Sequence, residues 1–241
     1  MFEKILKFQF VIVALILALG LVVATKQGTK NVVRDGISVT GSAYEIVQSD
    51  SARFEFNVVT RQPNRMAAYS LIQKQLPEVL NYLKSQGFAD ADIEVKTSNG
   101  YNTYRYNLNG SMTNEIAYYN LSQPVVIKSD DVQKIKTVSI DVQNLISKGI
   151  EIDPMPPQYY YSKLSDLKVK LLQDATTDAK QRATAMLKAT NNRTGKIQSV
   201  KMGVFQITPV DSTNVSDMGI NDTSTIDKKV TAVANVVFQV K

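Results

Sequence analysis

The sequence of 241 residues is long enough for one large domain or two small ones. Its composition, with 44% apolar and 21% charged residues, is ordinary for a globular protein. It contains no cysteine and no histidine, which excludes disulfides, thiolate metal sites, thiol nucleophiles and histidine acid–base chemistry. The formal net charge is +6, but the basic residues are scattered, so they indicate a solvated surface and no nucleic-acid partner.

An uncharged, apolar stretch of 18 residues runs from Phe8 to Thr25, after a short tail that carries Lys4 and Lys7. As a helix it would be about 27 Å long, close to the ~30 Å hydrocarbon thickness of a bilayer. We therefore expect an uncleaved signal anchor that crosses the cytoplasmic membrane once. A cleaved signal peptide and a secreted product are the alternative, because Val22 and Ala24 offer a small-residue cleavage pattern.

This leader predicts the organisation of the chain and the location of its main part. A large domain after a short N-terminal tail favours export, so we expect the main domain to be periplasmic or at the cell surface. The expected parts are a basic tail (1–7), a transmembrane helix (8–25), a tether (26–36) and an α+β domain (37–241).

Residues 37–60, ISVTGSAYEIVQSDSARFEFNVVT, predict two strands joined by a polar corner. In the second strand, Phe54, Phe56 and Val58 share one face, and polar residues alternate with them. We expect the two strands to form a hairpin with one apolar face and one polar face.

A helix is predicted from about Arg65 to Gln86, because apolar residues recur at helical spacing and Gly87 suits the C-terminal cap. Pro77 lies within this stretch and predicts a kink or an early break of the helix. Two strands follow, at about 93–108 and 112–128.

The dipeptide Asn109-Gly110 between these strands predicts a hairpin with a two-residue type I′ turn. Eight of the eleven tyrosines lie between Tyr101 and Tyr161, mostly on this hairpin. The turn would place Tyr101 opposite Tyr118 and set Tyr104 and Tyr106 on one face. If exposed, that face could stack on sugars, on an aromatic ligand or on a partner subunit; if buried, it is cross-strand packing.

The second half of the chain is predicted to contain two further helices and several strands. The first helix covers 130–148, with the apolar stripe Ile135, Val138, Val142, Leu145 and Ile146 and a stop at Gly149. Short strands at 150–152 and 158–161 flank the rigid sequence DPMPP. A long helix covers 163–189, and its buried face is Leu164, Leu167, Leu171, Ala175, Ala179, Ala183, Met186 and Leu187.

Strands at about 196–208 and 228–240 complete the chain, so a helix followed by two strands occurs twice, at 65–128 and 163–240. We interpret this order as a weak internal duplication of an αββ unit. Short connections between consecutive strands imply antiparallel sheets with helices packed on one face. The predicted class is α+β.

Three motifs resemble functional sites but lack the companions that such sites need. Ser165 and Lys168 match S-x-x-K without the other motifs of serine acyl-transfer enzymes, and Tyr159 and Lys163 have dehydrogenase spacing without a glycine-rich loop. Four aspartates in one segment do not have calcium-loop spacing, so we expect a mobile acidic loop: Asp211, Asp217, Asp222 and Asp227. The sequence therefore predicts no catalytic, cofactor-binding or metal-binding residues and no enzyme.

Three stretches resemble the SIMPL-domain family of bacterial envelope proteins: ISVTGSAYEIVQSDSARFEFNV, LLQDATTDAKQRATAMLKAT followed by TGKIQSV, and the closing VTAVANVVFQVK. The resemblance extends over residues 37–241. The chain departs from the usual pattern at Ala43, where relatives carry a second glycine, and at Ser49, where many carry proline.

The resemblance implies a periplasmic, secreted or membrane-anchored protein that is associated with envelope stress tolerance and self-assembles. The family has no established catalytic residues, so none are carried over. We therefore expect a non-enzymatic protein that forms homo-oligomers and contacts other envelope proteins. The alternative is a module that binds cell-wall glycan or a small ligand through the tyrosine-rich hairpin.

Overall fold

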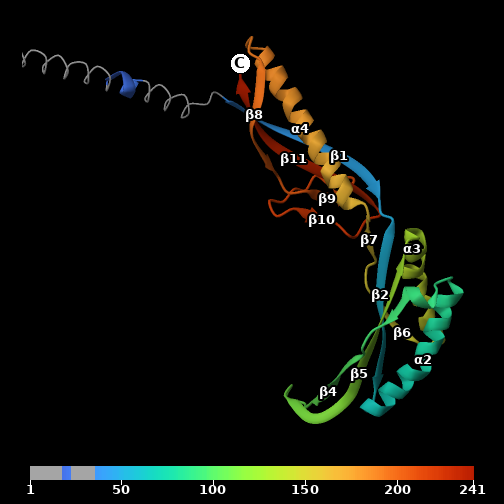
Figure 1. The fold of residues 1–241 in the computed structure, drawn as a ribbon. Helices are drawn as coiled ribbons and strands as arrows, with labels where there is room; N and C mark the ends of the chain where they lie inside the picture. The colour runs from blue at the N-terminus through green and yellow to red at the C-terminus, as the bar shows by residue number, and fades with distance from the viewer. Residues whose placement is uncertain (1–17, 23–35) are drawn as a thin grey trace, which may run out of the picture. The chain divides into compact units, whose positions relative to one another are not determined.

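The computed structural model describes residues 18–22 and 36–241 (Figure 1). Residues 18–22 are helical, while the predicted tail at 1–7, most of the predicted anchor and the tether up to residue 35 lie outside the described residues. Within the described ranges, no helix is both long and apolar enough to span a membrane. Helices combine with two β-sheets, which confirms a mixed α+β fold.

The observed elements follow the predicted order, with several predicted elements divided. The helices are α2 (Arg65–Ser85), α3 (Val132–Asp141) and α4 (Leu164–Lys188), with the 3₁₀ helices η1 (Asp90–Asp92) and η2 (Val142–Lys148). The first strands are β1 (Gly36–Gln48), β2 (Ser51–Gln62), β3 (Ile93–Val95), β4 (Asn99–Tyr106) and β5 (Met112–Ser129). The later strands are β6 (Glu151–Pro154), β7 (Gln158–Tyr160), β8 (Thr194–Met202), β9 (Gln206–Pro209), β10 (Ile220–Asn221) and β11 (Asp227–Val240).

The strands form two sheets in which most pairings are antiparallel. In the six-stranded sheet the order is β3-β5-β2-β6, β4 also pairs with β5, and β7 also pairs with β2. In the five-stranded sheet the order is β1-β11-β9-β10, and β8 also pairs with β11. Strand β10 is parallel to β9, so the sheets are not wholly antiparallel as predicted.

The predicted hairpin at residues 37–60 is wrong, because β1 and β2 belong to different sheets. The corner between them hydrogen bonds to distant segments: the N–H of Ser49 donates to Ile226 O (2.8 Å), and that of Asp50 to Tyr160 O (2.9 Å). The Asp50 carboxylate accepts from the N–H and the hydroxyl of Ser162 at 2.8 and 2.6 Å. These long-range partners hold the corner open, so the chain passes from one sheet into the other.

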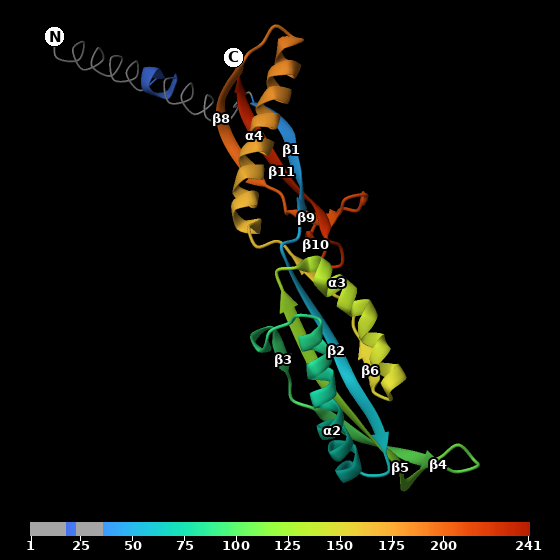
Figure 2. The ribbon, with the colours of Figure 1, turned by 90° about the vertical axis from the view of Figure 1, so that its right-hand side faces the viewer.

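The described chain forms two compact units, and β1, α4 and β11 contribute residues to both. The first unit comprises residues up to Ala43, Leu172–Gly203 and Ala232–Lys241. In this unit, α4 runs along β1 and β11 (Figures 1 and 2) and buries Ala175 and Ala179. A Cβ added to Gly41 of β1 would lie 2.1 Å from Ala175 O and 2.4 Å from Ala179 N. Glycine in the strand and alanine in the helix therefore allow this close approach of the two backbones.

The second unit comprises Tyr44–Leu171 and Val204–Thr231 and contains the six-stranded sheet. Helices α2 and α3 both lie on one face of this sheet (Figures 1 and 2). The alternation predicted for β2 is confirmed, since Phe54, Phe56 and Val58 are fully buried against the helices. We call the opposite face of the sheet, which carries Arg53, Glu55, Asn57, Val59 and Arg61 of β2, the open face.

The helices differ from the predictions in three details. Helix α2 continues through Pro77 without a break. The predicted second helix becomes 3₁₀ after Asp141, and this change of period leaves Ile146 53% exposed, outside the buried stripe. On α4, Met186 is 55% exposed, and the buried face narrows there to Ala183 and Leu187.

Replacing Gly41 with alanine should lower the free energy of unfolding by about 3 kcal/mol, because the new methyl group would overlap backbone atoms that cannot rotate away. Gly203→Ala is the matched control, since its Cβ would lie 3.4 Å from Val233. Urea denaturation followed by circular dichroism measures both. Equal midpoints for the two variants would contradict the close approach.

Candidate functional site

The β4–β5 hairpin exists as predicted, but its register differs. Five residues connect the strands, because Tyr106 pairs with Met112, and the N–H of Asn107 donates to Ser111 O at 2.9 Å. Two irregularities in the pairing of β4 with β5 then shift the register, so that Tyr101 pairs with Asn120 and the predicted pairing of Tyr101 with Tyr118 is wrong.

The tyrosines of this hairpin are divided between the surface and the interior. Tyr101 is 65% exposed and Tyr106 is 68% exposed, whereas Tyr119 is buried in the core beneath α2. Tyr104 and Tyr118 are half-buried. Two irregularities in the pairing, between Thr103 and Tyr104 and between Tyr104 and Tyr106, separate Tyr101 from the other two tyrosines of β4.

A cleft of about 440 Å³ lies on the open face of the six-stranded sheet, and Tyr101 is among its lining residues. It is lined by Val59, Thr60, Arg61, Asn99, Tyr101, Asn120, Leu121, Ser122, Glu151 and Asp153, from β2, β4, β5 and β6. Thr60 and Leu121 are buried on the helix face, so they contribute backbone to the floor. We call this site the open-face cleft.

Cross-strand register arranges the side chains of the open-face cleft in rows. One row contains Asn99, Ser122, Val59 and Glu151, because Ser122 pairs with both Asn99 and Val59, and Val59 also pairs with Glu151. The next row contains Tyr101, Asn120 and Arg61. The side chains of neighbouring residues in a row point to the same face of a sheet, so the rows form a continuous polar surface.

Two side chains of the open-face cleft are fixed by neighbours. The Asn120 amide donates to the Thr103 hydroxyl at 2.7 Å, and the Arg61 guanidinium lies 5.7 Å from the centre of the Tyr118 ring. The side chains of Asn99, Ser122, Glu151 and Asp153 have no hydrogen bond or ion pair with any residue that the structure describes. The cleft therefore presents amide, hydroxyl and carboxylate groups that are available to a ligand.

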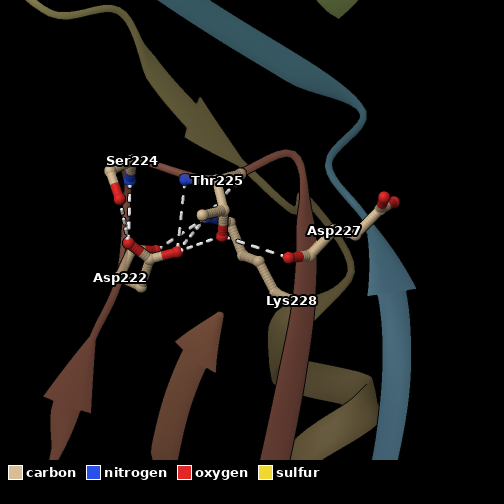
Figure 3. Close-up of polar contacts among 5 residues, drawn as sticks. All are labelled: Asp222, Ser224, Thr225, Asp227 and Lys228. Atoms are coloured by element: carbon tan, nitrogen blue, oxygen red, sulfur yellow. Dashed lines mark hydrogen bonds and ion pairs between the residues drawn. The ribbon is translucent and has the colours of Figure 1, made fainter. Parts of the chain in front are cut away.

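The acidic segment between β9 and β11 holds a second polar cluster (Figure 3). Lys228 is almost completely buried, and its Nζ donates to the carbonyl oxygens of Asp222 and Thr225, both at 2.7 Å. The Asp222 carboxylate accepts from the N–H and hydroxyl of Ser224 (2.9 and 2.6 Å) and from the N–H and hydroxyl of Thr225. Lys228 Nζ also lies 3.4 Å from this carboxylate.

Opposing effects determine the pKa values of this pair. Burial alone would raise the pKa of Asp222, but hydrogen bonds from Ser224 and Thr225 and the charge of Lys228 hold the pKa of this carboxyl well below its usual range. Burial lowers the pKa of Lys228, and the Asp222 carboxylate offsets part of that effect. The pair acts as a clamp that joins Asp222, which directly follows β10, to Lys228 of β11.

The other predicted motifs are not brought together into sites. In the S-x-x-K motif, Lys168 Nζ lies 5.3 Å from the centre of the Phe205 ring, and Ser165 is exposed. In the pair with dehydrogenase spacing, Tyr159 is buried whereas Lys163 is exposed. Among the described residues, no group of three or more acidic side chains is placed to hold a metal ion, and this includes Asp211, Asp217 and Asp227.

The sequence analysis assigned no role to Lys228 or to the acidic residues of β6. The alternation of side chains along each strand nevertheless indicates which face these residues occupy. Lys228 is in phase with the buried residues Val230 and Ala232, which places its side chain on the inner face of β11. Glu151 and Asp153 flank the buried Ile152, so both carboxylates point to the open face.

A family model described as "SIMPL: Protein of unknown function (DUF541)" matches residues 37–238. The match begins in β1 and ends in β11, so it includes both sheets and confirms the resemblance seen in the sequence. No curated protein matches the chain.

Asp222→Asn should lower the free energy of unfolding at neutral pH by about 3 kcal/mol, because it leaves the buried Lys228 cation without its carboxylate. Since the folded-state pKa of Asp222 is depressed, its contribution is present above the ordinary value of 3.8 and declines as the pH falls below it. Urea titrations across acid pH measure this difference. The exposed Asp227→Asn serves as the control; a pH-independent gap between Asp222→Asn and the wild type would contradict the assignment.

Proposed function

We propose, from the premise that this chain belongs to the SIMPL family, that it is a non-enzymatic envelope protein that acts through protein–protein contact. Its first partner is a second copy of itself, and other envelope proteins are further partners. Residues 8–25 anchor it in the cytoplasmic membrane, and residues 37–241 lie outside the cytoplasm, where the protein contributes to envelope stress tolerance.

The end of the β4–β5 hairpin supports this proposal. We define the hairpin tip as Tyr104, Tyr106, Leu108, Met112 and Ile116. Leu108 is completely exposed, and Tyr106, Met112 and Ile116 are exposed by 68%, 65% and 46%. Tyr106 pairs with Met112 and Tyr104 pairs with Ile116, so the two side chains of each pair lie next to one another. Several exposed apolar side chains at the end of one hairpin commonly mark a protein–protein contact site.

Backbone hydrogen bonds give the hairpin tip a defined conformation. The Asn107 side-chain oxygen accepts from the N–H groups of Asn109 and Ser111 at 3.1 and 2.9 Å, and the N–H of Gly110 donates to Asn107 O at 3.0 Å. Leu108 is therefore presented on an ordered loop. Ordering before binding favours association, because less conformational entropy is lost when the partner docks.

The position of the hairpin tip also favours contact with a partner. The hairpin curls away from α2, so α2 does not cover the tip (Figures 1 and 2). The flanking residues Arg105, Asn107 and Asn109 are polar, and an apolar centre with a polar rim is the usual composition of an interface. A copy of the same chain supplies a matching apolar surface and pairs with it through two-fold symmetry.

Leu108→Asp should shift the protein from oligomer to monomer, because a charge in the centre of an apolar contact must be desolvated without a partner. Size-exclusion chromatography with light scattering on the full chain in mild detergent measures the mass. Val215→Asp is the matched control, since Val215 is 82% exposed but lies outside the hairpin tip. A wild-type protein that is monomeric at every concentration would contradict the proposal.

The proposed location predicts that protease added to intact spheroplasts digests the part of the chain from residue 37 onward. The expected result follows because an anchor at 8–25 leaves that part on the outer side of the cytoplasmic membrane. Immunoblotting for a C-terminal tag follows the digestion, and a cytoplasmic protein serves as the lysis control. Full protection of the chain until lysis would overturn the assigned location.

A further inference from the structure

We propose that the open-face cleft is a binding site for a neutral oligosaccharide. Tyr101 forms the stacking surface of this site, and Asn99, Asn120, Ser122 and Glu151 supply its hydrogen bonds. None of these residues belongs to the hairpin tip. Either proposal can therefore fail without the other.

The floor of the open-face cleft restricts how it can recognise a ligand. Strand β2 lies between β5 and β6, so its backbone groups are paired in ladders on both sides at Val59. A peptide that joined as an extra strand would need an unpaired sheet edge, and the cleft lies over the face of the sheet. Recognition must therefore come from side chains.

The length of the cleft suits an extended ligand. The row from Asn99 through Ser122 and Val59 to Glu151 crosses four adjacent strands. Three spacings of ~4.8 Å between strands give about 14 Å along this row. A cleft of that length and about 440 Å³ has room for more than one sugar ring beside Tyr101.

The side chains of the open-face cleft have the hydrogen-bonding chemistry that sugar hydroxyls require. An amide both donates and accepts, a hydroxyl does the same, and a carboxylate accepts on two oxygens. The side chains of Asn99, Ser122, Glu151 and Asp153 have no partner among the described residues, and the amide of Asn120 is held by Thr103 with its oxygen available. These groups match a ligand that presents several hydroxyl groups side by side.

Tyr101 adds the apolar surface that a sugar ring needs. Tyr101 is 65% exposed at the wall of the cleft, in the row that it shares with Asn120 and Arg61. A pyranose has one face of C–H groups, which packs on an aromatic ring while its hydroxyls bond to polar neighbours. Aromatic stacking next to planar amides and carboxylates is the arrangement that the cleft provides.

The charges of the cleft select against anionic ligands. Glu151 and Asp153 are two carboxylates, and Arg61 is the single cation among the lining residues. A phosphate-rich or carboxylate-rich polymer would meet net repulsion, which argues against nucleic acid and acidic polysaccharide. The only apolar side chains of the open face in the cleft are those of Val59 and Tyr101, too few to anchor a hydrophobic ligand. A neutral, hydroxyl-rich chain remains the best match.

Titration calorimetry of the full chain with tetra-N-acetylchitotetraose, a neutral tetrasaccharide, tests the proposal. The detergent must have a head group that is not a sugar, so that it does not occupy the cleft. We expect saturable binding, roughly tenfold weaker binding by Tyr101→Ala, and unchanged binding by Tyr44→Ala. Tyr44 is the matched control because it is 66% exposed and lies outside the cleft.

A second variant and a second ligand complete the test. Ser122→Trp should abolish binding by filling the cleft from its floor, with an unchanged circular dichroism spectrum as the check on folding. A hyaluronan tetrasaccharide, which carries carboxylates, should bind more weakly than the neutral ligand. The proposal is overturned if the wild-type protein does not bind the neutral tetrasaccharide, if Tyr101→Ala binds as tightly as wild type, or if the anionic ligand binds equally well.

Discussion

The alternation of β2 is the constraint on which the second unit depends. Phe54, Phe56 and Val58 are fully buried against α2 and α3, and burying each such side chain contributes about 1.5–3 kcal/mol. Because side chains alternate along a strand, burying these residues forces Val59 and Arg61 onto the open face. The same register fixes the partners on β5 and β6, and so it determines which polar groups meet in the open-face cleft.

The sequence predicts the elements and the core well, because both follow from local periodicity. The face of α4 that contains Leu171, Ala175 and Ala179 is buried as predicted, and so are the apolar positions of β2. Strand partners are not local, and there the predictions fail. The corner at Asp50 has the composition of a tight turn, but its hydrogen bonds go to Ser162 and Tyr160. Nothing within residues 37–60 specifies those partners.

The clamp between Asp222 and Lys228 could be predicted only in part. Strand periodicity puts Lys228 on the inner face of β11, but its acceptors come from a segment whose conformation depends on β10 pairing with β9. A buried cation is costly unless it is fully hydrogen bonded, and here two carbonyl oxygens and a carboxylate surround it. Removing either side chain leaves the other charge buried without its counterion, so the pair favours one conformation of this segment.

The β4–β5 hairpin supplies both proposed surfaces, and irregular pairing is what allows it to do so. Between Tyr101 and Thr103 the strand follows the regular register of the sheet, which keeps Tyr101 over the open face beside Asn120. After Thr103 two shifts in register redirect the strand, and Tyr104 and Tyr106 pair with apolar residues at the tip. A regular two-residue hairpin would instead place Tyr101 opposite Tyr118, with Asn120 only a diagonal neighbour. The bulged hairpin thus keeps an aromatic residue at a polar cleft and a separate apolar group at the exposed end of the same two strands.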